Sequence, residues 1–312
     1  MKKKNVLITG GCGLLGSYVA AELQTHCGVT RFDIAGPETV DFVRGDVRQL
    51  TDIRAAVRNH EMVIHIAALA NIWAGTPEEI MDVNVTGVWN VLRAAEMEGV
   101  RRVVLCSSDS VIGFTVNNEH LQTPSYVPVD ERHNLNATDP YGLSKIIGEN
   151  IGRSFALRGT IEVVVLRPVF ILYPDMMAEI RARSIDPENY KGPAAGGQTP
   201  AGGGRLWHYV DPRDVARAFR LAIEIKDVRF ESFFISGPSH LHPQPTLERL
   251  KSICPVLPIV NDQKLYEEQP FAPIYDLEHA RNRLGYSPQH DLRALVYPQG
   301  TPNNQAALGA RS

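Results

Sequence analysis

A glycine-rich turn directly behind a short apolar stretch constrains this chain more than any other feature. The segment TGGCGLLG at residues 9–16 follows Val6–Ile8, and Gly10, Gly13 and Gly16 stand three residues apart within it. Such spacing allows a tight strand-to-helix turn, close approach of a pyrophosphate to the backbone, and packing of the helix against the sheet. The free N–H groups at the helix start also attract an anion. The turn indicates a dinucleotide site, and a purely structural turn is the alternative.

Short apolar stretches alternate with amphipathic ones through the first half of the chain. The pattern predicts strands at 6–8, 29–32, 62–66, 103–105 and 163–166, and helices at 14–23, 51–58, 77–98 and 139–157. Nearly continuous apolar strands are typical of parallel sheets that helices cover on both faces. We therefore expect an α/β fold built on a doubly wound parallel sheet, the Rossmann fold.

The pattern changes after residue 168, where Gly, Pro and charged residues become frequent. We expect residues 1–170 to form the dinucleotide-binding domain, and residues 206–236 to return to it with a helix at 214–225 and a strand at 232–235. Residues 171–205 and 237–312 are expected to form a smaller C-terminal, substrate-binding lobe. Within it, GPAAGGQTPAGGG at 192–204 is too flexible to pack a core, and is either a lid or a loose loop.

Composition argues against several classes of function. A net charge of -3 over 312 residues does not favour nucleic acid as a partner. No apolar run is long enough to cross a bilayer, so no membrane partner is expected. The four cysteines are too scattered for a metal site and are expected to be reduced thiols of a cytoplasmic protein. His240 and His242 lie in a proline-rich stretch without matching ligands, so no metal is expected.

Asp33 ends the second predicted strand, 17 residues after Gly16. A dinucleotide fold places a carboxylate there against the ribose hydroxyls, and that carboxylate would repel a 2′-phosphate. NAD is therefore favoured over NADP, with the nearby Arg31 as the feature that points the other way. The alternative for Asp33 is a surface residue in a turn. Asp46, in VRGDV, is expected either to contact the adenine or to cap a turn.

Tyr141 and Lys145 stand four residues apart, so they share one face of the helix predicted from residue 139. A nearby cation favours the phenolate, which would bring the pKa of the tyrosine closer to neutrality. Ser107 and Ser108 follow the strand VVLC at the carboxyl edge of the sheet, where doubly wound folds bind ligands. Ser108 is expected to bond the reacting oxygen, with simple capping of the strand end as the alternative.

Further motifs follow in a fixed order along the chain. They are GDV at 45–47, HIAA at 65–68, NVTGVWN at 84–90, SSDSVIG at 107–113, YGLSK at 141–145, LRP at 166–168 and YVDPRDVA at 209–216. Together with the glycine turn and Asp33, they resemble the extended short-chain dehydrogenases/reductases, the NAD-dependent epimerase/dehydratase family, over about residues 4–225. The resemblance implies an NAD-dependent oxidoreductase that transfers a hydride at a secondary alcohol or carbonyl.

The resemblance also implies residue roles. Tyr141 would be the acid/base, Lys145 would lower its pKa and hold the nicotinamide ribose, and Ser108 would position the substrate oxygen. Asn84 would brace the active-site helix. Helices at 77–98 and 139–157 would pair across a homodimer. The expected cofactor contacts are Gly10, Gly13, Leu14, Leu15, Gly16, Asp33, Asp46, Val47, Ala67, Ala68, Asn84, Tyr141, Lys145 and Pro168.

The net reaction and the substrate are less constrained. Many nucleotide-sugar members have an Asn where this chain has Phe170, whose ring cannot bond a diphosphate. Dehydratases often carry Asp-Glu after the catalytic Ser or Thr, whereas only Asp109 is present here. The segment SSDSVIGF is similar to uronate dehydrogenases, although Asp109 would repel a carboxylate, which makes a neutral aldose or polyol at least equally plausible. Expected substrate contacts are Ser108, Asp109, Ser110, Phe170 and Arg205.

The leading hypothesis is therefore an NAD-dependent dehydrogenase of a small sugar or sugar-derived compound. A nucleotide-sugar 4-epimerase with tightly bound NAD is the alternative. A catalytically silent NAD-sensing protein is a third reading, which the intact Ser108, Tyr141 and Lys145 disfavour.

Overall fold

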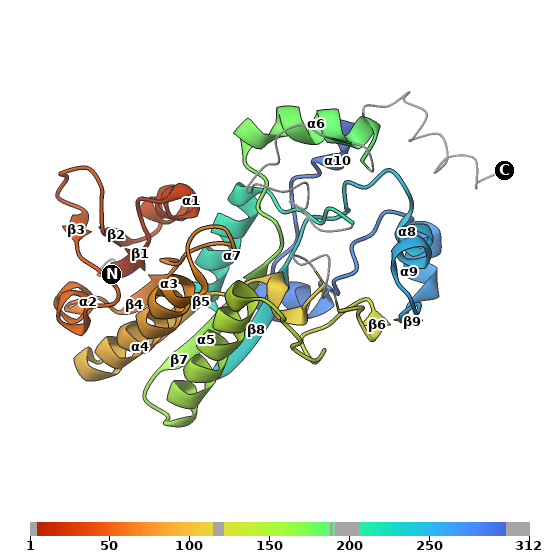
Figure 1. The fold of residues 1–312 in the computed structure, drawn as a ribbon. Coiled ribbons are helices and arrows are strands. Elements are labelled where there is room, and N and C mark those ends of the chain that lie inside the picture. Colours follow the sequence, from red (N-terminus) through yellow and green to blue (C-terminus); the bar gives the residue numbers. More distant parts are fainter. Residues whose placement is uncertain (1–4, 115–121, 188–189, 191–205, 298–312) are drawn as a thin grey trace.

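A seven-stranded parallel sheet forms the centre of the molecule (Figure 1). The computed structural model describes residues 5–114, 122–187, 190 and 206–297. The strand order is β3-β2-β1-β4-β5-β7-β8, and all neighbouring pairs are parallel. The order reverses between β1 and β4, which opens a crevice at their carboxyl ends. The strands are β1 (Asn5–Thr9), β2 (Gly28–Asp33), β3 (Phe42–Arg44), β4 (Met62–His65), β5 (Arg102–Cys106), β7 (Glu162–Pro168) and β8 (Phe230–Ile235).

Helices cover both faces of this sheet, as the alternating pattern predicts. One face packs against α1 (Leu14–Gln24) and α7 (Pro212–Glu224), and Val6 and Ile8 of β1 belong to the hydrophobic cluster there. The other packs against α2 (Leu50–Val57), α4 (Gly87–Glu98) and α5 (Pro140–Leu157), and Leu7 belongs to the second cluster. Successive side chains of a strand point to opposite faces, so one strand supplies both cores. The doubly wound Rossmann architecture is confirmed.

The single helix expected over residues 77–98 is divided into three parts. α3 (Pro77–Met81) begins with a capping box, in which Thr76 and Glu79 bond each other's backbone N–H groups. A π-helical segment, Asp82–Thr86, follows and leads into α4. A π turn holds one extra residue, which apolar periodicity does not reveal. It places Asn84 near the cavity described below.

The C-terminal part lies beyond the carboxyl ends of the strands, at the opposite end of the molecule from α2 (Figure 1). It contains α8 (Thr246–Ile253), α9 (Gln263–Glu268), α10 (Arg293–Val296) and the π-helical segment Ala280–Leu284, with α6 (Met177–Ile185) and the 3₁₀ turn Pro174–Met176 beside α10. β6 (Tyr126–Val127) pairs with β9 (Ile259–Val260), so residues near 126 join this part rather than the sheet. Within the described residues, no helix is both long and apolar enough to span a bilayer.

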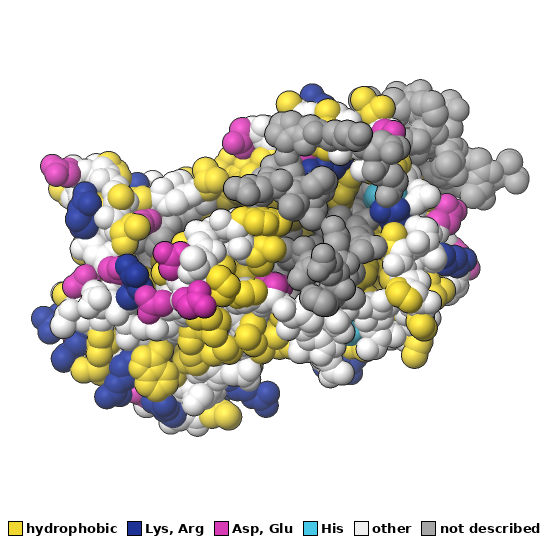
Figure 2. Space-filling model, viewed as in Figure 1, with side chains coloured by type: hydrophobic (Ala, Val, Ile, Leu, Met, Phe, Trp, Pro, Cys, Tyr) yellow, Lys and Arg dark blue, Asp and Glu magenta, His cyan; other side chains and the backbone are white. Residues whose placement is uncertain are grey.

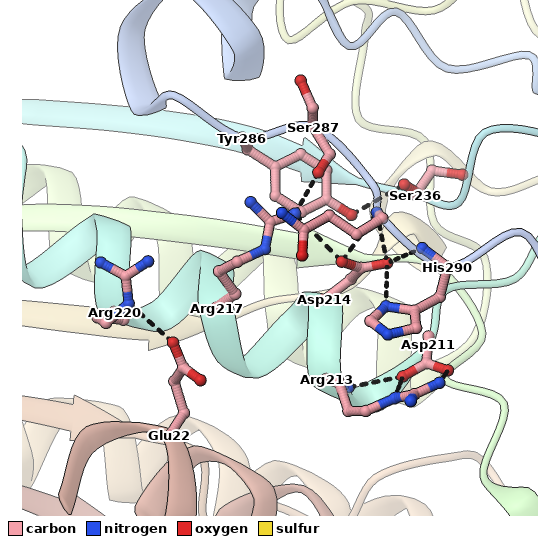
Figure 3. A network of polar contacts seen from close by, with 11 residues as sticks. Glu22, Asp211, Arg213, Asp214, Arg217, Arg220, Ser236, Tyr286, Ser287 and His290 are labelled. Atoms are coloured by element: carbon pink, nitrogen blue, oxygen red, sulfur yellow. Dashed lines mark hydrogen bonds and ion pairs between the residues drawn. The ribbon is translucent and has the colours of Figure 1, made fainter. Parts of the chain in front are cut away.

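A buried carboxylate on α7 fixes the end of the chain to the sheet (Figure 3). Asp214 is fully buried and accepts the backbone N–H groups of Gln289 and His290, both at 3.0 Å. Arg217 donates to the same carboxylate at 3.1 Å and lies over the ring of Tyr286. The Tyr286 hydroxyl in turn donates to the Ser236 carbonyl just after β8. We call this the Asp214 anchor; it holds residues 286–290 against α7.

Candidate active site

A cavity of about 680 Å³ opens at the carboxyl ends of β1, β2, β4, β5 and β7. Among the described residues expected to contact the cofactor, all except Asn84 line it. Four of the expected substrate contacts line it as well: Ser108, Asp109, Ser110 and Phe170. Arg205 lies outside the described residues. The sheet therefore brings residues from the first 170 positions of the chain into one cavity.

The three glycines of the turn have different steric surroundings. Gly10 has φ +69°, and a Cβ there would lie 2.6 Å from the Ala67 nitrogen. A Cβ on Gly16 would overlap the Gly10 carbonyl oxygen. At Gly13 the nearest atom to an added Cβ is 3.4 Å away. The protein's own packing therefore requires glycine at positions 10 and 16, while the bare backbone at Gly13 leaves space on the cavity side.

This space lies at the start of α1, where an anion is favoured. Gly13 is the N-cap residue and provides no side-chain cap, and the first turn has no acidic residue. Unpaired N–H groups and the helix dipole attract negative charge at such a position. Asp33 lies beside the turn, because its Oδ2 accepts the Cys12 N–H at 3.1 Å. An open helix start with a carboxylate next to it fits the pyrophosphate and ribose of a dinucleotide.

Two other charged pairs clarify the adenosine end. Arg31 donates to Asp41 through Nε at 2.9 Å and Nη2 at 3.2 Å, and these bonds hold the pKa of Asp41 below its usual value. The guanidinium that could have favoured NADP is thus engaged by a carboxylate. Asp46 accepts the Arg48 backbone N–H at 2.9 Å and pairs with its side chain at 2.6 Å. Asp46 therefore caps a turn and also lines the cavity.

The expected catalytic residues come from two neighbouring segments. Ser108 follows β5 and accepts the Ser110 N–H at 3.1 Å, which caps the 3₁₀ turn Asp109–Ile112. α5 begins with Asp139 as its N-cap and Pro140 in its first turn, which places Tyr141 at the helix start. Tyr141 is 91% buried and shares a hydrogen bond with Ser108. The structure brings both side chains to the same end of the cavity.

The electrostatics of Tyr141 differ from the expectation. Burial raises its pKa well above the usual value, and the hydrogen bond with Ser108 offsets only part of this rise. Lys145 donates to the Cys106 carbonyl at 2.9 Å, with its Nζ 5.5 Å from the centre of the Tyr141 ring. Burial also lowers the pKa of Lys145. The expected shift of Tyr141 toward neutrality is therefore wrong for this arrangement, because loss of solvation outweighs a cation bonded elsewhere.

Asn84 does not line the cavity, because other groups use its amide. Its Oδ1 accepts the Leu69 N–H at 2.8 Å, and its Nδ2 donates to the Leu69 carbonyl at 3.1 Å and to Ser144 at 3.0 Å. Ser144 donates in turn to the Tyr141 carbonyl at 2.7 Å. Asn84 thus connects the loop after β4 to the first turn of α5.

Three buried groups at the cavity complete its polar end. Burial raises the pKa of Asp109 to about 6, although the hydroxyl of Tyr275 donates to its Oδ2 at 2.8 Å. His208 also lines the cavity, and its ring packs edge-on against Tyr275. Sequence reasoning missed His208 and Tyr275; the only available signal for His208 was its place directly before the YVDPRDVA motif. Within the described part of the chain, no group of three His, Cys, Asp or Glu residues could hold a metal ion.

The comparison with protein families decides the classification. Residues 6–233 match the model of the NAD dependent epimerase/dehydratase family. The chain belongs to this family. It is accordingly an NAD-dependent enzyme, and the glycine turn, the open start of α1 and Asp33 are the groups that fit this cofactor.

Curated relatives act on different substrates by their names. Uronate dehydrogenase of Pseudomonas syringae pv. tomato is 34% identical over 52% of this chain and 58% of its own length. UDP-glucose 4-epimerase of Streptomyces lividans is 33% identical over 45% and 44%. Sterol demethylase protein B of Methylococcus capsulatus is 29% identical over 74% and 69%. For the first two, the chain spans about half the length of the relative.

Solved structures support the fold. MoeE5 in complex with UDP-glucuronic acid and NAD aligns with a TM-score of 0.67 at 23% identity, over 94% of this chain and 96% of that one. This likeness agrees with the strand order and the helix layers described above.

Proposed function

We propose that this protein is an NAD-dependent dehydrogenase that interconverts a secondary alcohol and a carbonyl in a small sugar or sugar-derived compound. The observation that carries the proposal is that Ser108, Tyr141 and Lys145 line the same cavity as the glycine turn. Bound NAD would supply the acceptor for the hydride from the substrate carbon.

In this mechanism the protein's own groups manage the oxygen and its proton. The Ser108 hydroxyl holds the reacting oxygen, and Tyr141 exchanges the proton with it. Because burial raises the pKa of Tyr141, the phenol is neutral in this arrangement and is set to donate to a carbonyl oxygen. In the direction of oxidation, the ammonium of Lys145 lowers the cost of the phenolate that takes the hydroxyl proton.

The substrate end of the cavity supports a small polar compound over a nucleotide sugar. Asp109 and Ser110 provide polar groups beside Ser108. Phe170 lines the cavity where a nucleotide-sugar enzyme would use an amide, and its ring cannot bond a diphosphate. The relative named uronate dehydrogenase adds support for a free sugar or sugar acid.

A second candidate is an apolar secondary alcohol. Trp73, Phe170 and Met176 also line the cavity, and these side chains suit a hydrocarbon skeleton better than hydroxyls. Sterol demethylase protein B matches over a larger share of this chain than the uronate dehydrogenase does.

The proposed assembly is a homodimer through α4 and α5. Figure 2 shows hydrophobic side chains gathered over these helices. Large apolar residues on them are exposed: Trp89, Met97, Leu143 and Leu157. Contiguous exposed apolar surface often marks an interface between proteins.

The test is a substrate panel followed by NADH absorbance. The purified protein is incubated with NAD and, separately, with free aldoses, sugar acids, 3-hydroxysterols and UDP-sugars. Net NADH from a free sugar supports the proposal, and net NADH from a sterol alone supports the second candidate. Interconversion of a UDP-sugar without net NADH would overturn both in favour of the epimerase.

A matched variant tests the chemistry. Tyr141→Phe removes the hydroxyl and keeps the buried ring, so we expect turnover to fall by about 10²–10⁴-fold. Binding of NADH, measured by its fluorescence, should change little. Full turnover in this variant would remove Tyr141 from the mechanism.

A further inference from the structure

His208 is brought to the cavity from a segment that the proposed chemistry does not use. It lies between Trp207 and Tyr209, and it forms an antiparallel bridge with His240. Its side chain lines the cavity, and the residue is only 5% exposed. The ring packs edge-on against Tyr275, with ring centres 4.9 Å apart. His208 therefore reaches the same end of the cavity as Asp109, which Tyr275 bonds.

The hydrogen bonds of His208 fix the position of its proton. The backbone N–H of Ile274 donates to its Nε2 at 3.1 Å, so Nε2 must be the unprotonated nitrogen. Burial lowers the pKa of the ring to about 3, which keeps it neutral near pH 7. A neutral imidazole whose Nε2 accepts carries its hydrogen on Nδ1. His208 thus presents one defined hydrogen-bond donor.

Asp109 presents the complementary group. The Tyr275 hydroxyl donates to Oδ2 at 2.8 Å, and the Ser108 hydroxyl reaches Oδ1 at 3.3 Å, a long and weak hydrogen bond. A carboxylate oxygen accepts more than one hydrogen bond, so Asp109 keeps capacity for a further donor. Tyr275 contacts both partners and sets the donor of His208 and the acceptor of Asp109 side by side.

We propose that His208 and Asp109 select a neutral, polyhydroxylated substrate, an inference that rests on the proposed function. One substrate hydroxyl accepts from Nδ1–H of His208, and another donates to the Asp109 carboxylate. A substrate carboxylate in the second place would face Asp109 and be rejected, since two like charges at close range repel. Tyr275 is a positioning residue for both groups.

Two isosteric variants of His208 separate the donor from the acceptor. His208→Asn places an amide N–H near the position of Nδ1, whereas His208→Gln restores only an acceptor for Ile274 near Nε2. We expect His208→Gln to raise KM for a neutral aldose about tenfold, the equivalent of one lost hydrogen bond, with kcat within about twofold. His208→Asn should stay closer to the unchanged protein. His240→Asn is the matched control, because His240 is buried beside His208 and does not line the cavity.

Asp109→Asn tests the rejection of acids. It should raise the ratio of kcat/KM for a uronate to that for the matching aldose by about tenfold or more. Tyr275→Phe should raise KM for the aldose, while Tyr286→Phe, which loses a buried hydroxyl bond away from the cavity, should not. A readout without turnover is the rise in Tm that the aldose causes in the NADH-saturated protein, which His208→Gln should abolish.

The outcomes distinguish this inference from the proposed function. If Tyr141→Phe abolishes turnover of the aldose while His208→Gln and Asp109→Asn leave KM, the acid-to-neutral ratio and the Tm shift unchanged, the inference fails and the proposed function stands. If no free sugar yields NADH or raises Tm, both fail. A normal KM in His208→Gln together with a raised KM in His240→Asn would show that packing, and not the donor, controls binding.

Discussion

Asp109 and Asp214 are both buried carboxylates, and both connect the C-terminal part of the chain to the Rossmann core, but their partners differ. Asp214 receives two backbone N–H groups and a guanidinium, all at 3.0–3.1 Å, and lies away from the cavity. Asp109 receives two hydroxyls, one of them at 3.3 Å, and lines the cavity. Burial raises the pKa of Asp109 to about 6.

The comparison teaches how the same residue type serves structure in one place and binding in another. Charge-assisted bonds saturate the Asp214 carboxylate, which compensates for its loss of water. Neutral hydroxyls compensate Asp109 less completely, so it retains affinity for a further donor or for a proton. A carboxylate that is incompletely satisfied at a cavity is therefore a better candidate for ligand binding than one that is fully satisfied in a core.

The largest expected effect is the loss of the Asp214 anchor. Asp214→Ala leaves Arg217 and two buried N–H groups without their acceptor, and should lower the free energy of unfolding by about 3–5 kcal/mol. Urea denaturation measures this. Asp262→Ala is the control, because Asp262 also accepts a backbone N–H but caps an exposed helix, where the loss should be about 1 kcal/mol. Equal losses in the two variants would contradict the distinction.

The glycine turn offers the same contrast between structure and binding within a few residues. Gly16→Ala forces a Cβ onto the Gly10 carbonyl oxygen and should lower the free energy of unfolding by about 1–3 kcal/mol. Gly13→Ala meets no such atom, so Tm should hold while the Kd for NADH rises about fivefold or more, roughly 1 kcal/mol. NADH fluorescence titration and thermal unfolding of both variants measure the two effects. A stability loss at Gly13 as large as that at Gly16 would break the contrast.

The smallest expected effect is the pH dependence of Asp109, which Tyr275 and Tyr141 face. If its carboxylate binds substrate, kcat/KM for a neutral sugar should fall about twofold from pH 7 to pH 6, where half of it is protonated. Asp109→Asn should remove this limb. The sign for stability is opposite: because the folded-state pKa lies above the usual ~3.9, the proton stabilises the fold below pH ~4, and this contribution is lost as pH rises through about 6.

Much of this molecule follows from local sequence patterns. Gly10, Gly13 and Gly16 mark the turn, and the apolar strands place Asp33 and Ser108 at the carboxyl edge of the sheet, where the cavity lies. These inferences succeed because a parallel sheet sets the carboxyl ends of all its strands on one edge.

The missed features depend on long-range packing. Tyr275 reaches Asp109 across 166 residues of chain, and His208 takes its tautomer from a backbone N–H 66 residues away. The expected lowering of the Tyr141 pKa was wrong because helical spacing reports how near Lys145 lies and says nothing of burial. The π segment around Asn84 was missed since apolar periodicity does not register one extra residue in a turn.

The order in which the ribosome releases the chain bears on the contact between Tyr275 and Asp109. The glycine turn, Ser108, Tyr141 and Lys145 have all emerged before residue 150, whereas Tyr275 and the segment held by Asp214 come last. Domains form as their residues become available during synthesis. The growing polypeptide therefore possesses the reactive groups long before it possesses the means to choose among alcohols, and discrimination is the last property it acquires.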